Sequence, residues 1–454
     1  MFRKILVANR GEIARRIIKT LNILGIKSVA VFSEADSEAS YLREASESIC
    51  IGPALARESY LCEDALLQAA LATDCEAIHP GYGFLSENAR FAVRCAQQKL
   101  TFVGPSPELL SLMGDKAKAR STMASLGVPV LKGSDGVISD FRVAEQIAQD
   151  IAYPVLLKAR AGGGGKGMRL VQNSAGLKDA WDEARREALS AFGDAELYVE
   201  KFVKNARHIE FQVLGDSYGE VIILGERECS LQRKNQKLLE EAPANNFTHK
   251  QREEIYELIS KALKKLNYTN AGTMEFLLGH DGQLYFMEMN TRLQVEHPIT
   301  ELITGLDIIE WQIRVAANNK LGFKQQDIKI TGHAIECRIN AEDPAQNFQP
   351  CPGLIENLVL PESSLKGPVR IDTHIESGFR VVPFYDSMLA KIITYGPTRA
   401  RALELMSTTL DQIRINGIKT TLEFHKAILR HPSFREGSYD CSFIEKHMDK
   451  LLER

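Results

Sequence analysis

The sequence lacks the features that would place it in a specialised class of protein. No apolar run approaches the roughly 20 residues that span a bilayer, so we expect no membrane segment. Residues 1–8 enter a strand-like run directly, without a charged leader, a long apolar region and a cleavage site, so we expect no signal peptide. Low-complexity segments and internal repeats are also absent. An ordinary globular chain is therefore expected.

The cysteines and histidines form no recognisable framework. None of the eight cysteines stand in Cys-x-x-Cys spacing, which is typical of free thiols in a reducing cytoplasm. The ten histidines show no ligand-spaced cluster, so we expect no zinc site. The net charge is −3, from 56 Lys and Arg against 59 Asp and Glu, and it gives no sign of nucleic-acid binding.

The length of 454 residues suggests about three domains. We expect an N-terminal domain over residues 1–114, a central domain over 115–330 with a lid near 131–204, and a strand-rich C-terminal domain over 331–454. In the first domain short apolar runs alternate with helical patterns, which predicts an α/β fold with a parallel, Rossmann-like sheet. The dinucleotide fingerprint is missing, because residues 8–12 contain one glycine where three are needed; this argues against a nicotinamide oxidoreductase.

The most informative stretch is residues 287–298, Met-Glu-Met-Asn-Thr-Arg-Leu-Gln-Val-Glu-His-Pro. Alternation of side chains predicts a strand, with a helix following over 299–318. One face of that strand carries Glu288, Asn290, Arg292, Gln294 and Glu296. A solvated edge strand gives the same alternation, but it favours Lys, Thr and Glu rather than a set in which every member coordinates or donates. We therefore expect this face to bind a ligand or take part in chemistry.

The residues before this stretch predict a metal site. Asp281-Gly282 lies between two apolar runs and is typical of a two-residue hairpin turn with both residues at positive φ. Such a turn places Glu275 directly opposite Glu288, where like charges repel. A hard cation bound between the two acids turns this repulsion into attraction, and Asn290 adds an oxygen ligand. Mg²⁺ or Mn²⁺ is therefore expected. The alternative is a fortuitous pair of acids in a longer loop.

The glycine-rich loop 161–167 predicts phosphate binding. Its row of backbone N–H groups suits polyphosphate oxygens, and Lys116 and Lys158 supply point charges. It is not a Walker A loop, because Lys166 is followed by glycine and the loop joins two strands. We expect the loop to close as a lid that excludes water.

Two further segments have open interpretations. Tyr82 lies between two glycines, which favours either an exposed ring in a tight turn or a packed tyrosine. In an extended segment Arg233, Asn235 and Lys237 share one face, which suits an anion; a solvated basic strand is the alternative.

Taken together, these motifs resemble biotin carboxylase, the ATP-grasp component of biotin-dependent carboxylases, over essentially the whole chain. The most specific pieces are residues 79–88, 288–298 and 336–344. Other ATP-grasp ligases share the carboxylate–amide strand but not the Arg-x-Gln-x-Glu-His-Pro continuation. The resemblance implies an ATP-grasp fold for the central domain.

The resemblance also implies a role for each matching residue. The ATP contacts implied are Lys116, Lys158, Gly163, Gly164, Gly165, Glu200, Lys201, Val203, His208, Gln232 and Asn235. The metal ligands implied are Glu275, Glu288 and Asn290, and the bicarbonate contacts are Lys237, Arg292, Gln294 and Val295. Glu296 matches the general base, and Arg338 the residue that faces the biotin ureido oxygen. Tyr82, from its glycine-flanked turn, is expected as a further substrate contact. Asn235 departs from the histidine that is usual in the family.

The activity implied is ATP- and bicarbonate-dependent carboxylation of biotin through carboxyphosphate. No Ala-Met-Lys-Met motif occurs, so we expect biotin on a separate carrier protein or domain, together with a separate carboxyltransferase. An acetyl-CoA or other acyl-CoA acceptor and a homodimer are expected. The alternatives are a pyruvate or urea carboxylase component, another ATP-grasp ligase, or a regulatory ATP-binding module.

Overall fold

A computed structural model describes residues 1–160, 167–245 and 247–452. Its N-terminal lobe is built on a parallel sheet in the order β3-β2-β1-β4-β5. The strands are β1 (Lys4–Val7), β2 (Lys27–Phe32), β3 (Glu47–Cys50), β4 (Ala77–His79) and β5 (Thr101–Phe102). The helices of this lobe are α1 (Gly11–Ile23), α2 (Glu63–Ala72), α3 (Ala89–Gln97) and α4 (Pro107–Gly114). The expected Rossmann-like sheet is confirmed.

Both faces of this sheet are buried. Ile5 and Val7 pack with the apolar side of α1, whereas Leu6 and Ala8 pack with residues of α2 and α3. Strand order reverses between β1 and β4, and ligands of open α/β sheets bind outside the carboxyl ends of strands at such a point. Residues 8–12 and 80–88 leave the sheet there.

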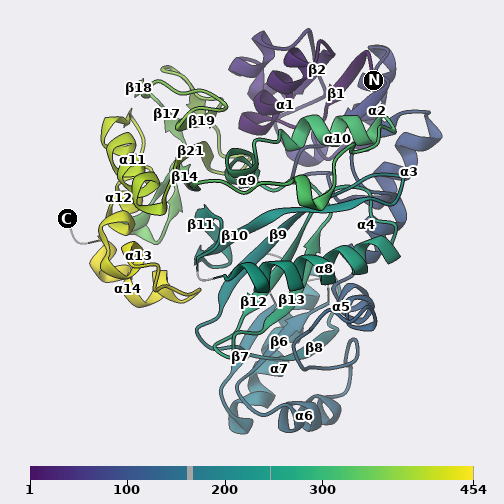
Figure 1. Cartoon of the computed structure of the whole chain (residues 1–454), viewed down its shortest axis with the longest axis vertical. Coiled ribbons are helices and arrows are strands. Elements are labelled where there is room, and N and C mark those ends of the chain that lie inside the picture. The colour runs from purple at the N-terminus through teal and green to yellow at the C-terminus, as the bar shows by residue number, and fades with distance from the viewer. Residues whose placement is uncertain (161–166, 246, 453–454) are drawn as a thin grey trace.

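A large antiparallel sheet occupies the centre of the molecule (Figure 1). Its order is β13-β12-β9-β10-β11-β14-β21-β19. The strands are β9 (Arg207–Gly215), β10 (Val221–Arg233), β11 (Gln236–Ala242), β12 (Asn270–Leu278), β13 (Leu284–Asn290), β14 (His333–Asn340), β19 (Val369–Thr373) and β21 (Met388–Gly396). Because β11 pairs with β14, one sheet crosses the boundary expected near residue 330.

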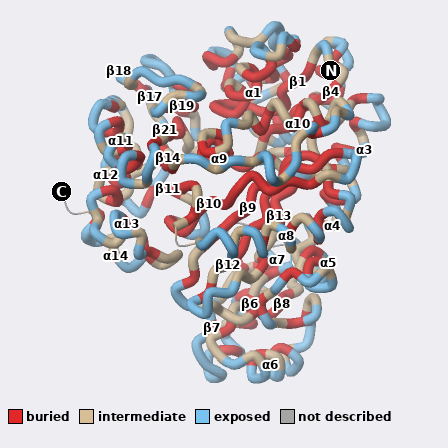
Figure 2. Tube along the Cα trace, viewed as in Figure 1, coloured by how far each residue is buried: buried red, intermediate tan, exposed pale blue. Residues whose placement is uncertain are grey.

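The two faces of this sheet differ in character. Odd-numbered residues of β9 such as Phe211 pack against α8 (His249–Lys265) in an apolar core. On the other face Gln212 accepts a hydrogen bond from Arg227, which also donates to Thr300 in α9 (His297–Thr304). β9 and β10 are buried over most of their length (Figure 2). The polar face beneath α9 is therefore buried as deeply as the core.

A smaller lobe lies at the bottom of Figure 1. Its sheet has the order β7-β6-β8, and α6 and α7 pack on it around the buried Trp181. The elements are α6 (Phe141–Asp150), β6 (Val155–Ala159), β7 (Met168–Val171), α7 (Leu177–Phe192) and β8 (Leu197–Lys201). The loop expected to close over phosphates, with Gly163, Gly164 and Gly165, lies outside the described residues.

The C-terminal helices pack on the far end of the large sheet, and α14 returns to β10. They are α11 (Arg399–Gln412), α12 (Leu422–Arg430), α13 (Pro432–Arg435) and α14 (Phe443–Leu452). Short strands complete the C-terminal lobe: β15 (Glu342–Asp343), β16 (Gln349–Pro350), β17 (Gly353–Leu354), β18 (Asn357–Val359), β20 (Arg380–Val381) and β22 (Arg414–Asn416). Outside this lobe, the α-helices of the described residues not yet given are α5 (Lys116–Ser125) and α10 (Ile308–Ala316).

The strand expected over 287–298 is wrong beyond Asn290. β13 ends there, because the N–H of Thr291 donates to a Glu87 carboxylate oxygen at 3.1 Å instead of to a neighbouring strand. The single helix expected over 299–318 is also wrong. Gly305, at φ 74°, ends α9, and Asp307 caps α10 by accepting a hydrogen bond from the N–H of Glu310 at 2.9 Å.

The two-residue turn expected at Asp281-Gly282 is wrong as well. The loop spans residues 279–283, with the N–H of Gly279 donating to the carbonyl of Gln283 at 2.9 Å. This longer loop shifts the pairing by one residue, so that Leu278 pairs with Leu284. A β-bulge at Met287 shifts it back, and Glu275 does pair with Glu288.

The extended segment expected at residues 233–237 is wrong. Lys234 and Asn235 have φ values of 47° and 63° and form the turn between β10 and β11, so the segment is not extended. Arg233 stacks over Phe348 at 4.4 Å from the ring centroid, whereas Lys237 pairs with Glu210.

Candidate functional site

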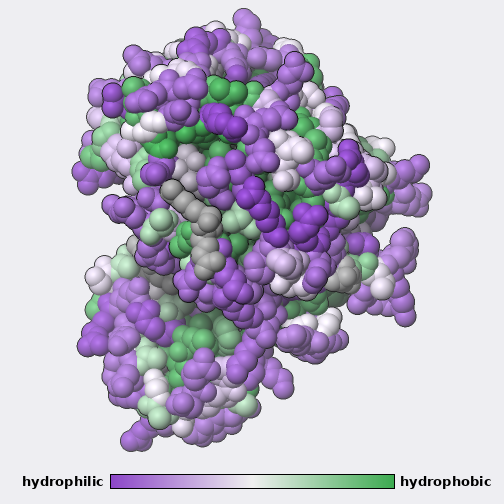
Figure 3. All heavy atoms as spheres, turned by 90° about the vertical axis from the view of Figure 1, so that its left-hand side faces the viewer, coloured by the Kyte–Doolittle hydropathy of each residue, from purple (hydrophilic) through white to green (hydrophobic). Residues whose placement is uncertain are grey.

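A cavity of about 660 Å³ lies where the three lobes meet. Lysines and aromatic residues line one end, including Lys116, Lys158 and Tyr198. Residues of the N- and C-terminal lobes line the other end, including Arg10, Phe84 and Phe384. The stretch at residues 287–295 also lines the cavity, through Met287, Glu288, Asn290, Arg292, Gln294 and Val295, together with Lys237 and Arg338. Most of the surface in Figure 3 is hydrophilic, with apolar side chains in separate groups.

Glu296 is a fully buried acid next to the cavity. It is the residue before α9 and its exposure is 0%. Its two carboxylate oxygens lie 2.5 Å from Nζ of Lys237 and 2.9 Å from Nη2 of Arg338. Burial alone would raise the pKa of Glu296, but Lys237 and Arg338 outweigh it and hold that pKa well below its usual range. Glu296 is therefore ionised, and it is a weak base as long as both cations stay paired with it.

Lys237 joins three acids from three elements. Its ammonium group lies 2.5 Å from Glu210, 3.0 Å from Glu275 and 2.5 Å from Glu296. Burial would lower the pKa of Lys237, but these carboxylates raise it well above the ordinary value. An anion that draws Lys237 away from Glu296 removes part of what holds the Glu296 pKa down, so anion binding makes Glu296 a stronger base.

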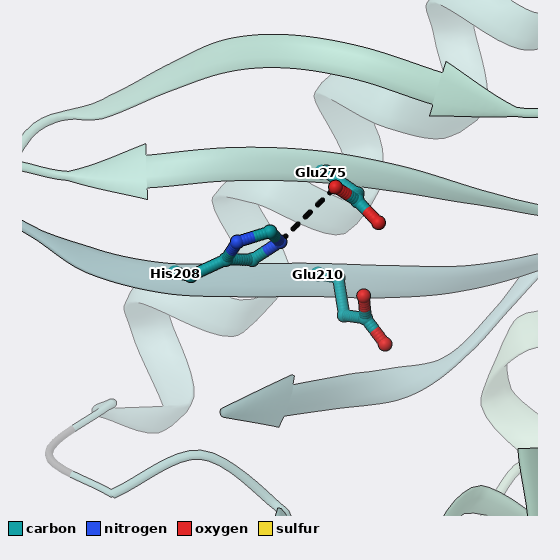
Figure 4. A group of neighbouring side chains, drawn as sticks. All are labelled: His208, Glu210 and Glu275. Carbon is teal, nitrogen blue, oxygen red and sulfur yellow. Dashed lines mark ion pairs between the residues drawn. The ribbon is translucent and has the colours of Figure 1, made fainter. Parts of the chain in front are cut away.

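His208, Glu210 and Glu275 form a buried group whose ligand atoms lie within 4.8 Å of one another (Figure 4). Nε2 of His208 lies 3.2 Å from Glu275, while Glu210 is already paired with Arg227 and Lys237. With two cations on Glu210, this group has little charge left for an added ion.

The predicted metal ligands supply a better set of oxygens. Glu275 and Glu288 are cross-strand partners, and Asn290 donates from Nδ2 to Glu275 at 2.8 Å. Glu288 lies 2.8 Å from Nζ of Lys116. Two carboxylates and an amide oxygen fit Mg²⁺, which prefers hard oxygen ligands.

Three neighbouring side chains hold the guanidinium group of Arg292. Nε lies 2.9 Å from Glu87, Nη1 donates to Gln294 at 3.0 Å and Nη2 donates to Asn290 at 3.0 Å. Gln294 in turn donates to Glu275 at 3.1 Å. The loop after β13 thus gathers Arg292 and Gln294 beside the acids, although it is not a strand. Val295 also lines the cavity.

On the nucleotide side the predicted residues separate into two groups. Lys116, Lys158, His208, Gln232 and Asn235 line the cavity. Nε2 of Gln232 lies 2.7 Å from Nδ1 of His208. Burial lowers the pKa of Lys116, but Glu288 raises it further, so the net shift is upward. These residues offer cationic and polar groups at one end of the cavity.

The second group consists of Glu200, Lys201 and Val203, and none of them lines the cavity. Glu200 accepts a hydrogen bond from Lys158 at 2.5 Å. Lys201 turns away and donates to the backbone carbonyls of Ala152 and Tyr153 at 2.8 and 3.2 Å. Val203 follows β8 in the loop that leads to β9.

Sequence reasoning missed four residues that surround the site. Glu87 lies in the motif at residues 79–88 but was given no role, and it holds Arg292. Glu210 was detectable, because polar residues alternate along 208–212 in a strand that is otherwise apolar. Lys391 was detectable as a single lysine within the apolar run 388–393. No local signal distinguishes Glu12, which follows β1 in α1.

Comparison with known proteins gives one family over nearly the whole chain. Residues 1–110 match the model described as "Biotin carboxylase, N-terminal domain", and residues 336–446 match "Biotin carboxylase C-terminal domain". Residues 115–324 match "Carbamoyl-phosphate synthase L chain, ATP binding domain". A biotin carboxylase of Nostoc sp. is 48% identical over 98% of this chain and 99% of its own.

Solved structures give the same result. The biotin carboxylase domain dimer of Hydrogenobacter thermophilus 2-oxoglutarate carboxylase, in complex with MgADP, ADP and bicarbonate, is 46% identical. It superposes with a TM-score of 0.95 over 100% of this chain and 99% of that chain. The biotin carboxylase subunit of a pyruvate carboxylase is 47% identical, with a TM-score of 0.86 and full coverage of both chains. In the described part of this chain, no helix is both long and apolar enough to cross a bilayer.

Proposed function

The chain belongs to the biotin carboxylase family, and we propose that its central cavity carboxylates the ureido nitrogen of biotin, using ATP and bicarbonate. The observation that carries this proposal is the buried Glu296, ionised between Lys237 and Arg338. Arg292 and Gln294 line the cavity on one side of it, and lysines for phosphate line the cavity beyond. Lys237, Arg338, the anion site and the phosphate-binding cations thus line one cavity, and the base Glu296 is buried directly behind Lys237 and Arg338.

In the first half of the reaction a bicarbonate oxygen attacks the γ-phosphate of ATP, which forms carboxyphosphate and releases ADP. Such phosphoryl transfer is mostly positioning and charge neutralisation. Arg292, held by Glu87, Gln294 and Asn290, offers a planar guanidinium to the bicarbonate. Glu296 accepts the bicarbonate proton at a carboxylate oxygen, and its basicity rises as Lys237 turns to the anion.

In the second half carboxyphosphate breaks down to CO₂ and phosphate. Phosphate removes the proton from the biotin ureido nitrogen, which then attacks CO₂. Arg338 stabilises the negative charge that develops on the ureido oxygen. Its Nη2 is held by Glu296 and Glu240, so the guanidinium is in place before biotin arrives.

Glu275, Glu288 and Asn290 are the residues that would hold Mg²⁺ or Mn²⁺. When bound, the ion neutralises phosphate charge. In the structure Lys116 and Lys237 lie against Glu288 and Glu275, so two lysines already balance the charge of these acids.

The direct test is an assay of ATP cleavage by the purified protein. We expect cleavage that depends on bicarbonate and is stimulated by free biotin. Folded protein that cleaves ATP at the same rate with and without bicarbonate and biotin would contradict the proposal.

Two substitutions separate the half-reactions. Glu296→Gln removes the base and should lower bicarbonate-dependent ATP cleavage about 10²–10⁴-fold, the range for a positioned general base. Arg338→Gln should keep much of that cleavage but lower biotin carboxylation about 10²–10³-fold, the scale of one donor to a developing oxyanion. Measured rates of phosphate release and of carboxybiotin formation distinguish the two. If both variants kept full carboxylation, the assigned roles would be wrong.

The partners and the division of the chain are parts of the same proposal. Biotin arrives on a carrier protein or domain, and a carboxyltransferase passes the carboxyl group to an acyl-CoA; pyruvate or urea is the alternative acceptor. A homodimer is proposed because the Hydrogenobacter structure is described as a dimer. The domains proposed are 1–114, 115–330 with a lid near 131–204, and 331–454, supported by the family matches. Eight free thiols support a cytoplasmic location.

A further inference from the structure

Lys391 is a buried cation that no step above uses. It stands in β21 with 0% exposure, between Ala390 and Ile392, which are buried in the core. A buried ammonium group is costly unless it is paired and hydrogen-bonded. Its Nζ donates to the backbone carbonyl of Val295 at 2.9 Å and lies 3.1 Å from Glu12. Lys391 thus reaches from the C-terminal lobe into the loop that precedes α9.

The register of the sheet places Lys391 beside Arg338. Their Cα atoms are partners in the antiparallel pair β14–β21, so the two side chains lie next to each other on one face. Arg338 reaches the side chain of Glu296 at 2.9 Å, and Lys391 reaches the carbonyl of Val295 at 2.9 Å. Two neighbouring cations therefore hold both parts of a single dipeptide, Val295-Glu296.

The backbone at this dipeptide has no strand to hold it. β13 ends at Asn290 and α9 begins at His297, so Glu296 lies in the connecting loop. The carbonyl that Lys391 binds belongs to the peptide unit that leads into Glu296. Fixing the plane of that peptide fixes the direction in which the Glu296 side chain starts.

We propose that Lys391 is a positioning residue for Glu296, and that Glu12 and Tyr82 hold Lys391 in place. This inference rests on the proposed function, in which Glu296 is the base. Lys237 and Arg338 hold the carboxylate of Glu296, and the hydrogen bond from Lys391 to Val295 holds the peptide from which that side chain starts.

Glu12 and Tyr82 extend the contact to the N-terminal lobe. Glu12 stands in α1 with 3% exposure, and Oε1 accepts a hydrogen bond from the hydroxyl of Tyr82 and also faces Lys391. Tyr82 lines the cavity from the loop after β4. Asp372, at 3.9 Å, and Glu336 are further acids near Lys391. A substrate that moves Tyr82 therefore acts on Glu296 through two side chains and one peptide.

The first experiment replaces Lys391 by methionine, which keeps the length of the side chain and removes the ammonium group. We expect kcat of bicarbonate-dependent ATP cleavage, measured without biotin, to fall about 10–100-fold, the scale of a misplaced catalytic group. The KM for ATP should stay unchanged, because Lys391 does not line the cavity. The matched control is Lys426→Met, which removes an 11%-exposed lysine and its contacts to Glu423 and Asp411 in the same lobe and should leave kcat unchanged.

The second experiment replaces Tyr82 by phenylalanine and decides the matter if Lys391→Met does not fold. Without biotin present, a tyrosine that only touches biotin would have no effect on bicarbonate-dependent ATP cleavage. The relay through Glu12 instead predicts a fall in kcat of about threefold to tenfold, the scale of one hydrogen bond. Wild-type kcat in a folded Lys391→Met variant, or in Tyr82→Phe when Lys391→Met is unfolded, would overturn the inference. Absence of cleavage by the wild-type protein would instead overturn the proposed function.

Discussion

At the scale of single residues, the most unusual feature near the site is a pair of buried acids. Glu240 and Glu336 are partners across β11 and β14, and each has 0% exposure. Burial raises the pKa of Glu240 to about 7, with the ion pair to Arg338 opposing the shift. Burial likewise raises the pKa of Glu336 well above its ordinary value, with Lys391 opposing. Two acids so close favour a state in which one of them carries a proton.

This pair makes stability depend on pH. A carboxyl whose folded pKa of about 7 exceeds its ordinary value of 4.5 binds a proton that the unfolded chain releases. The contribution of Glu240 to the free energy of unfolding therefore falls as pH rises from about 4.5 to about 7, by on the order of 3 kcal/mol. Glu240→Gln should flatten this fall.

The measurement is the urea midpoint of both proteins at about pH 5 and about pH 8. The comparison uses the change between the two pH values, because the substitution also removes the partner of Arg338 at both. Glu423→Gln, at a 79%-exposed side chain, is the control. An unchanged difference between the two pH values in Glu240→Gln would contradict the assignment.

At the scale of elements, the turn between β10 and β11 aims a lysine into the cavity. Lys234 and Asn235 are at positive φ, as a two-residue hairpin turn requires, and asparagine tolerates that region better than most residues. The turn pairs Gln232 with Lys237 and so places Lys237 near the three acids. Asn235 has a structural task in the turn and a place in the cavity wall.

Asn235→Gly separates these two tasks. Glycine adopts positive φ without strain, so the turn and the melting temperature should be kept. The amide is lost, and the KM for ATP should rise about threefold to tenfold, the scale of one hydrogen bond, while the KM for bicarbonate stays the same. Steady-state kinetics and a melting curve test this. A lower melting temperature with an unchanged KM for ATP would assign Asn235 to the turn alone.

At the scale of the whole molecule, buried ion pairs join α1 of the N-terminal lobe, α9 and strand β19 of the large sheet. Glu301 of α9 accepts hydrogen bonds from Arg16 of α1 at 3.0 Å and from Arg370 of β19 at 2.7 Å. Arg370 also pairs with Asp372 at 2.6 Å. These side chains are nearly inaccessible, so each charge depends on its partners. The network lies under the helix that follows Glu296.

Removing the central acid should destabilise the whole protein. Glu301→Gln leaves two buried guanidinium groups short of a partner, and the free energy of unfolding should fall by about 3–5 kcal/mol. Chemical denaturation measures this. Glu376→Gln breaks an exposed pair with Arg43, whose side chains are 50% and 62% exposed, and should change stability by less than about 1 kcal/mol. Equal effects of the two substitutions would contradict the role given to burial.

Much of the candidate site was readable from residue types and spacing. The pairing of Glu275 with Glu288 was predicted and occurs, although the turn that was expected to produce it does not. The observed five-residue loop shifts the pairing by one residue, and the bulge at Met287 shifts it back. The predicted pair therefore forms, although the sequence analysis foresaw neither the longer loop nor the bulge. The strand predicted over 287–298 was wrong beyond Asn290. Polar and apolar residues do alternate in this stretch, but after Asn290 the backbone hydrogen-bonds to Glu87 of the N-terminal lobe instead of to a neighbouring strand.

The sequence by itself determined the fold class and the parallel N-terminal sheet, because periodicity and turn chemistry act over a few neighbouring residues. Through its motifs it also determined the family. Only the tertiary structure decided that β11 pairs with β14, which joins the central and C-terminal lobes in one sheet. That pairing sets which buried charges meet: Glu240 with Glu336, and Arg338 beside Lys391 over Glu296. The meeting of charges depends on register between strands distant in the chain, for which no local pattern exists.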